Sequence, residues 1–152
     1  MAYLPAGGTV AVLGLSYKPH TEVIENSQGL DLAQQLLARG VRVIVYDPAA
    51  MDNSRVALTG KVVFAENSKA CLCTDVVVIT TPWPEFQQIS PQDLQRPNGD
   101  RTTIFDCWRI LPQDKFAAVA DYRSIGLGPR PNRPNYELQL HSEQYAGIAK
   151  GA

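Results

Sequence analysis

One short segment of the sequence combines side chains that suit the binding of a nucleotide. It follows an apolar run and reads GLSYKPHT, residues 14–21. The ammonium of Lys18 can neutralise a phosphate, the ring of Tyr17 can stack on a base or hydrogen-bond to it, and the hydroxyl of Thr21 can bind a phosphate oxygen. On composition alone, a surface loop in which Lys18 is solvated and Tyr17 covers the sheet edge is the simpler interpretation.

The same segment lacks the glycines of a dinucleotide site. Such a site reads Gly-x-Gly-x-x-Gly after the first strand, because bare backbone must approach the pyrophosphate at the start of the helix. Here an aromatic ring and an ammonium stand at those positions, so side chains face the ligand instead. Asp47 closes the second apolar run, where a dinucleotide-binding domain places its ribose-binding acid. Without the glycine pattern, we interpret Asp47 as a turn cap.

The cysteines and histidines form no constellation that supports catalysis or metal binding. A thiol such as that of Cys107 needs a base or a positive environment to act as a nucleophile, and we interpret it as a semi-buried structural cysteine. Cys71 and Cys73 are one residue apart, which on a helix points them to different faces, and no further ligand accompanies them. With only His20 and His141, no triad can be argued. The sequence therefore predicts no catalytic residue and no metal site in this chain.

Alternating strands and helices must position these side chains. Ser27 is the expected cap of the clearest helix, whose apolar residues recur at helical spacing until Gly40. Shorter helical or turn segments are expected at 49–58, at 68–73, after Pro82 and at 111–120. Apolar runs predict strands at 9–13, 41–46, 62–64, 75–80, 102–106 and 122–126. The alternation predicts a three-layer, Rossmann-like α/β fold with a doubly wound, mainly parallel sheet of about five or six strands, which binds ligands at the carboxyl ends of its strands.

Composition and charge exclude several classes of protein. Hydrophobic residues make up 45% of the 152 residues and charged residues 19%, which is typical of one globular domain. A net charge of -1 provides no basic field to draw the protein onto nucleic acid. The short apolar runs predict neither a membrane span nor a signal peptide, and the odd number of cysteines, three, fits a reducing cytoplasm. We expect one domain over residues 8–128 and a Pro-rich, flexible tail over residues 129–152.

Four stretches of the sequence resemble one known family. VAVLGLSYKPHTEVIENS, residues 10–27, is similar to the opening of the carboxy-terminal domain of UDP-glucose/GDP-mannose dehydrogenases. The stretches ARGVRVIVYDP, VVVITTPWPEF and IFDCWRIL are similar to the same family in the same order. The resemblance extends over residues 8 to about 128, and the combination of the Lys-containing loop with T-x-W-x-E-F and D-x-x-R is specific.

The resemblance implies roles for individual residues. Tyr17 and Lys18 match the aromatic-Lys pair that lies against the nucleotide in that family. In that family an Arg beyond a strand-end Asp also reaches the nucleotide, and Arg109 is its counterpart here. Relatives often have the spacing D-G-R, which would place Trp108 at that position. Stacking on the nucleotide would then replace charge pairing. Glu25 stands where the family has an Arg that faces the nicotinamide cofactor, so we expect no cofactor-binding residue here. The expected substrate-nucleotide residues are Tyr17, Lys18, Thr21 and Arg109.

The resemblance also implies a function. The chain is expected to be the nucleotide-binding carboxy-terminal domain of an NAD-dependent nucleotide-sugar dehydrogenase, an oxidoreductase of polysaccharide biosynthesis that oxidises the sugar alcohol to the acid. Its expected partners are a UDP- or GDP-sugar and the amino-terminal dehydrogenase domains, in cis or in trans. The chain alone lacks the catalytic Cys motif and the NAD-binding domain, so NAD is expected only in the full-length enzyme. The alternative is a free-standing nucleotide-binding regulatory or interaction module without catalytic activity.

Overall fold

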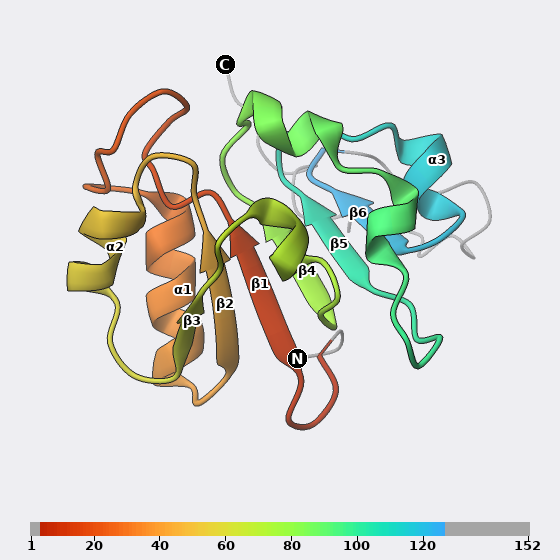
Figure 1. Cartoon of the computed structure of the whole chain (residues 1–152), viewed down its shortest axis with the longest axis horizontal. Coiled ribbons are helices and arrows are strands. Elements are labelled where there is room, and N and C mark those ends of the chain that lie inside the picture. Colours follow the sequence, from red (N-terminus) through yellow and green to blue (C-terminus); the bar gives the residue numbers. More distant parts are fainter. Residues whose placement is uncertain (1–3, 127–152) are drawn as a thin grey trace, which may run out of the picture.

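Six strands form one sheet in which each strand runs parallel to its neighbours (Figure 1). The computed structural model describes residues 4–126. The strands are β1 (Thr9–Leu13), β2 (Arg42–Tyr46), β3 (Val62–Phe64), β4 (Val76–Ile79), β5 (Thr103–Asp106) and β6 (Asp121–Ser124). Their order across the sheet is β3-β2-β1-β4-β5-β6, which confirms the predicted doubly wound, parallel α/β fold. The tail predicted for residues 129–152 lies outside the described residues.

The connections between the strands are helical, as expected, but shorter than the sequence suggests. The helices are α1 (Gln28–Ala38), α2 (Met51–Ala57) and α3 (Gln113–Ala117), and the 3₁₀ helices are η1 (Ser68–Cys71), η2 (Pro84–Gln88) and η3 (Pro91–Leu94). The helical stretch expected after Pro82 is thus two short turns. Pro84 and Pro91 each occupy the first position of a turn, where a missing N–H is tolerated, and Pro91 cannot continue the turn that Pro84 begins. Among residues 4–126, no helix is both long and apolar enough to cross a membrane.

Helix α1 has the start, face and end that the sequence predicts. The Ser27 hydroxyl accepts a hydrogen bond from the Leu30 N–H at 3.1 Å and so caps the first turn. Leu30, Ala33 and Leu36 are buried against the sheet. Gly40 follows the helix with φ of 75°, a conformation that costs glycine little.

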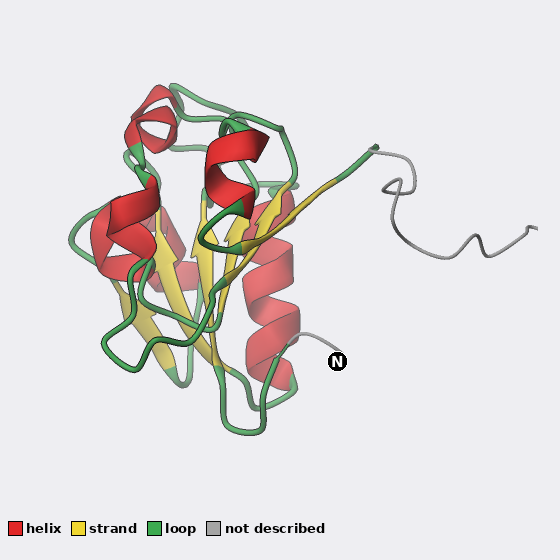
Figure 2. Ribbon diagram, turned by 90° about the vertical axis from the view of Figure 1, so that its right-hand side faces the viewer, coloured by secondary structure: helices red, strands yellow, loops and turns green. Residues whose placement is uncertain are grey.

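Two hydrophobic cores lie on the two faces of the sheet. Figure 2 shows helices on both sides of the sheet. Alternate residues of a strand point to opposite faces, so Val10 and Val12 of β1 pack towards α1, whereas Ala11 and Leu13 face the other side. The other side is covered by the 3₁₀ helices and α3, each of which contributes a residue to the core on that face. The loops at the carboxyl edge of the sheet are anchored in these cores by Leu15, Trp83 and Leu111.

Two glycines bring the end of β1 against the start of α1. Gly14 has φ of 104°, and a Cβ on it would lie 2.6 Å from the backbone nitrogen of Thr81. A Cβ on Gly29, in the first turn of α1, would lie only 1.9 Å from the carbonyl oxygen of Gly14. The loop between these glycines therefore starts and ends at the same place, next to the end of β4.

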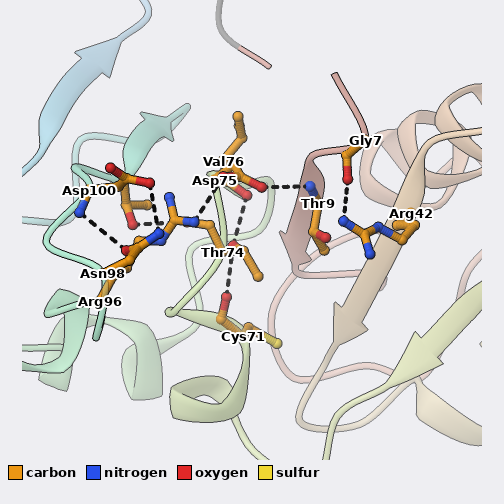
Figure 3. Close-up of polar contacts among 11 residues, drawn as sticks. Gly7, Thr9, Arg42, Cys71, Thr74, Asp75, Val76, Arg96, Asn98 and Asp100 are labelled. Atoms are coloured by element: carbon orange, nitrogen blue, oxygen red, sulfur yellow. Dashed lines mark hydrogen bonds and ion pairs between the residues drawn. The ribbon is translucent and has the colours of Figure 1, made fainter. Parts of the chain in front are cut away.

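The opposite, amino edge of the sheet is held by a partly buried carboxylate, Asp75, which directly precedes β4 (Figure 3). Its Oδ2 accepts a hydrogen bond from the Thr9 N–H at 2.8 Å, and its Oδ1 pairs with the Arg96 guanidinium at 2.9 Å. The Thr74 hydroxyl beside it donates to the carbonyl oxygen of Cys71 at 3.0 Å. Asp75 thus ties the start of β1 to the start of β4 and to the segment that leads to β5.

Replacing Asp75 by asparagine is expected to lower the free energy of unfolding by about 1–2 kcal/mol near neutral pH. Burial alone would raise the pKa of Asp75, but the Thr9 N–H and the Arg96 guanidinium outweigh it and lower that pKa. A group with a lowered folded-state pKa stabilises the fold above its unfolded pKa of about 3.9, and its contribution is lost as the pH falls through the folded pKa. Urea unfolding of both proteins near pH 7 and near pH 3 measures this, and an equal difference at both pH values would contradict it.

Candidate functional site

The candidate site lies at the carboxyl edge of the sheet, where the loops after β1, β2, β4 and β5 meet. All strands are parallel, so all these loops leave at the same edge. The neighbouring strands β1 and β4 lead to connections on opposite faces, towards α1 and towards η2. This is the topological switch point, where open parallel sheets bind their ligands.

The loop after β1 presents Tyr17 and Lys18 to solvent. Tyr17 is 60% exposed, and Lys18 is also exposed. The loop is closed by its own backbone, because the Tyr17 N–H donates to the carbonyl oxygen of Val23 at 2.8 Å. The Thr21 hydroxyl accepts from the Val23 N–H at 3.2 Å, so it also shapes the loop. Three of the four expected site residues, Tyr17, Lys18 and Thr21, therefore belong to one closed loop.

Asp47, at the end of β2, is buried, and its carboxylate accepts six hydrogen bonds of 2.8–3.1 Å. The donors are the N–H groups of Leu15, Ser16, Ala49 and Ala50, the hydroxyl of Ser16 and the indole N–H of Trp83. Burial alone would raise the pKa of Asp47, but four backbone N–H groups outweigh it and lower that pKa. The turn cap expected from the sequence is present, and Asp47 also holds the loop after β1.

Trp83, in the loop after β4, completes this network. Its indole N–H lies 3.1 Å from both the Ser16 hydroxyl and Asp47 Oδ2. The ring of His20 meets it edge to face, with ring centroids 5.3 Å apart. The Thr81 hydroxyl donates to the Ser16 carbonyl oxygen at 3.0 Å. The loops after β1 and β4 are therefore joined by side chains.

A second buried carboxylate, Asp106 at the end of β5, holds the other candidate loop. It accepts hydrogen bonds from the Trp108 N–H at 3.1 Å, the Leu111 N–H at 2.9 Å and the Tyr122 hydroxyl at 2.9 Å. Burial, followed by the bond to Asp106, raises the pKa of Tyr122. Arg109 lies in this loop with φ of 57°, a left-handed conformation.

Trp108 and Arg109 point to different parts of the sheet edge. The Trp108 indole N–H donates to the carbonyl oxygen of Thr80, at the end of β4, at 2.8 Å, although its side chain is 56% exposed. A guanidinium nitrogen of Arg109 lies 3.9 Å from where a Cβ on Gly126 would be, beyond β6. Because β4 separates β5 from β1, Arg109 starts about 10 Å from the loop of Lys18. Trp108, rather than Arg109, reaches the switch point.

A hollow of about 390 Å³ lies beside Trp108, between the start of α1 and the end of β4. Gln28, Thr80 and Trp108 are among its lining residues. It provides room for a flat ring against the exposed face of Trp108.

Cys71 and Cys107 show no features of a nucleophile. Burial, together with the neighbouring Asp106 carboxylate, raises the pKa of the Cys107 thiol, whereas a reactive thiol needs a lowered pKa. Burial raises the pKa of Cys71 to about 12. Within the described part of the chain, no three His, Cys, Asp or Glu side chains cluster as metal ligands would.

These residues do not fit the pattern of a dinucleotide site. The carboxylate of Asp47, where a ribose would bind, is saturated by protein donors, and Tyr17 and Lys18 stand in place of the glycines that approach a pyrophosphate. The strand order and the loops at the switch point instead define a Rossmann-like nucleotide-binding domain whose loop contacts would come from side chains.

Comparison with known proteins identifies the family. Residues 11–113 match the model of the UDP-glucose/GDP-mannose dehydrogenase family, UDP binding domain, and the chain belongs to this family. A UDP-glucose 6-dehydrogenase of Rhizobium meliloti (strain 1021) is 36% identical over 123 residues, which are 79% of this chain and 28% of that protein. The chain therefore spans little more than a quarter of the length of such a relative.

Solved structures agree with this assignment. A UDP-glucose dehydrogenase from Pyrobaculum islandicum matches with a TM-score of 0.64 and 32% identity, over 80% of this chain and 26% of that chain. An NDP-N-acetyl-D-galactosaminuronic acid dehydrogenase from Methanosarcina mazei Go1 matches with a TM-score of 0.65 over 79% of this chain and 25% of that chain, and at 19% identity it supports the fold alone.

Proposed function

We propose that this domain binds the nucleotide part of a UDP- or GDP-sugar through Tyr17, Lys18, Thr21 and Arg109. The observation that carries the proposal is the loop after β1, in which the exposed Tyr17 and Lys18 directly follow two residues fixed by buried hydrogen bonds. Lys18 would neutralise the diphosphate, Tyr17 would stack on the base, and Thr21 would donate to a phosphate oxygen.

The loop after β5 would complete the contact. The guanidinium of Arg109 suits a phosphate or a ribose hydroxyl, whereas Trp108, beside the hollow at the switch point, suits stacking on a ring. Alanine variants of the two residues distinguish these roles. The loss of nucleotide affinity becomes smaller with added salt if the removed side chain formed a charge pair, and it is unchanged by salt if the side chain stacked on a ring.

In the full-length protein, the domain would position a sugar nucleotide for oxidation by other domains. The relatives are dehydrogenases, and this chain spans about 28% of the length of the first of them. We propose that amino-terminal dehydrogenase domains, in cis or in trans, bind NAD and carry out the oxidation, while this domain supplies binding energy and orientation. A cytoplasmic location fits the three cysteines, all of which are free thiols.

A second candidate function is a nucleotide-binding regulatory or interaction module without catalytic activity. Glu25 favours it, because this exposed carboxylate stands in place of the Arg that faces the cofactor in the resembling family. The two candidates are distinguished by measuring NAD reduction by the chain together with amino-terminal dehydrogenase domains in the presence of UDP-glucose. The dehydrogenase candidate predicts reduction of NAD, and the regulatory candidate predicts none.

Calorimetric titration of the 152-residue chain with UDP, GDP and NAD tests the binding proposal. We expect saturable binding of UDP or GDP and none of NAD. Lys18→Ala is expected to weaken binding about 10- to 100-fold, the effect of losing one charge-assisted hydrogen bond.

Lys61→Ala is the matched control for charge. Lys61 is also an exposed lysine, but it directly precedes β3 and therefore lies at the opposite edge of the sheet. Equal losses in the two variants would show that only net charge matters, and binding of NAD alone would overturn the proposal.

A further inference from the structure

Asp47 is the most heavily hydrogen-bonded side chain near the candidate site, and the binding roles proposed above do not use it. It is 1% exposed and accepts six hydrogen bonds. A carboxylate offers about four lone-pair directions, so six donors leave no site for a ligand hydroxyl. A charge buried in this way is stable only because these donors replace its water.

The donors divide into two groups with different roles. The N–H groups of Ala49 and Ala50 bind Oδ1 and form the turn after β2. The N–H groups of Leu15 and Ser16, the Ser16 hydroxyl and the Trp83 indole all converge on Oδ2. One oxygen atom thus fixes the beginning of the loop after β1 and ties it to the loop after β4.

The residues held by Oδ2 directly precede the two that face solvent. Leu15 and Ser16 are almost fully buried, and Tyr17 and Lys18, the next two, are exposed. Each residue is joined to the next by a rigid peptide plane, so fixing Ser16 restricts where the side chains of Tyr17 and Lys18 can reach. Ser16 is also held from the β4 side by the Thr81 hydroxyl.

We propose that Asp47 is a positioning residue that holds Tyr17 and Lys18 in place for a nucleoside diphosphate and that, being saturated, gives a dinucleotide ribose no acceptor. This inference rests on the proposed function, because it explains what holds the loop after β1 in the shape that nucleotide binding would need. In dinucleotide-binding domains the acidic residue at this position binds the ribose, whereas here Asp47 holds the loop after β1.

Asp47→Asn tests the inference because an amide keeps the size of the carboxylate but turns one acceptor into a donor that opposes the N–H groups around it. We expect UDP affinity to fall at least about tenfold, measured on the 152-residue chain well below its melting temperature. Hydrogen exchange at the amides of Leu15 and Ser16 should accelerate relative to the amides of β1.

Asp75→Asn is the matched control. Asp75, like Asp47, is a carboxylate that binds a backbone N–H, but it is only partly buried and lies at the amino edge of the sheet. It should lower stability and leave UDP affinity within about twofold of wild type, because the site and the change are far apart. If Asp75→Asn weakens UDP binding as much as Asp47→Asn does, the effect is one of global stability and the inference is wrong.

Trp83→Phe and Ser16→Ala serve if Asp47→Asn does not fold. Each removes a donor to Oδ2 and keeps the charge of Asp47, and each should weaken UDP binding by a smaller factor of about two to five. UDP binding at the wild-type level by these variants, or by folded Asp47→Asn, would overturn the inference alone. Absence of binding of both UDP and GDP by the wild-type chain would instead overturn the proposed function, and the inference with it.

Discussion

Replacing Gly29 by alanine is expected to destabilise the domain by about 3 kcal/mol or more. A Cβ at this position would lie 1.9 Å from the carbonyl oxygen of Gly14, and this contact is with backbone, which cannot rotate away as a side chain can. Alanine would gain about 1 kcal/mol in helix propensity, but the clash is larger. Relief requires α1 to move away from the end of β1, which would also open the loop between them.

Thermal or urea unfolding measures this loss, and the neighbouring residue provides the control. Gln28 is exposed in the same helical turn, so Gln28→Ala should change the stability by no more than about 0.5 kcal/mol. If Gly29→Ala is as stable as Gln28→Ala, the close approach of α1 to Gly14 is not a constraint on the fold.

Replacing Asp106 by alanine is expected to cost about 3–5 kcal/mol. The variant leaves the N–H groups of Trp108 and Leu111 and the hydroxyl of Tyr122 without this shared acceptor, and the latter two are buried. The loop that carries Arg109 should lose its shape as well, so the variant is expected to bind UDP weakly even where it remains folded.

Two variants separate this anchoring role from simpler effects. Tyr122→Phe removes a single donor to Asp106 and should cost about 1–2 kcal/mol, less than Asp106→Ala. Asp114→Ala removes an exposed carboxylate from α3 and should cost no more than about 0.5 kcal/mol. If Asp106→Ala lowers the free energy of unfolding no more than Tyr122→Phe does, the backbone N–H groups of this loop are hydrogen-bonded to water in the variant and Asp106 is not their essential acceptor.

Local pattern was sufficient to predict most of the fold. The β-branched run from Thr9 to Leu13 forms β1 with the predicted bounds, and Ser27 caps α1 through its hydroxyl, because both depend on neighbours in the chain. The helical stretch expected after Pro82 is present, but local pattern did not show that it is divided into two short turns, the second of which begins at Pro91.

The candidate site was predictable only in part. Tyr17 and Lys18 stand out by residue type, and the structure places them exposed at the expected edge, while their roles and those of Thr21 and Arg109 stay predictions. The bond between Asp47 and Trp83 joins residues 36 positions apart, which no local pattern can reveal. The divergent directions of Trp108 and Arg109 depend on the left-handed backbone of Arg109, which residue type alone does not predict.

The two tryptophans of the chain lie in the loops after β4 and β5, in opposite environments. Trp83 is 7% exposed and hydrogen-bonded to Asp47, whereas Trp108 is 56% exposed beside the hollow at the switch point. The fluorescence of Trp83 should therefore be blue-shifted and protected from quenching by acrylamide, whereas that of Trp108 should be red-shifted and readily quenched. The domain thus contains its own pair of fluorescent probes, one for the hydrogen bonds of Asp47 that hold the loop after β1 and one for the hollow beside the loop after β5, and needs no label to report on either.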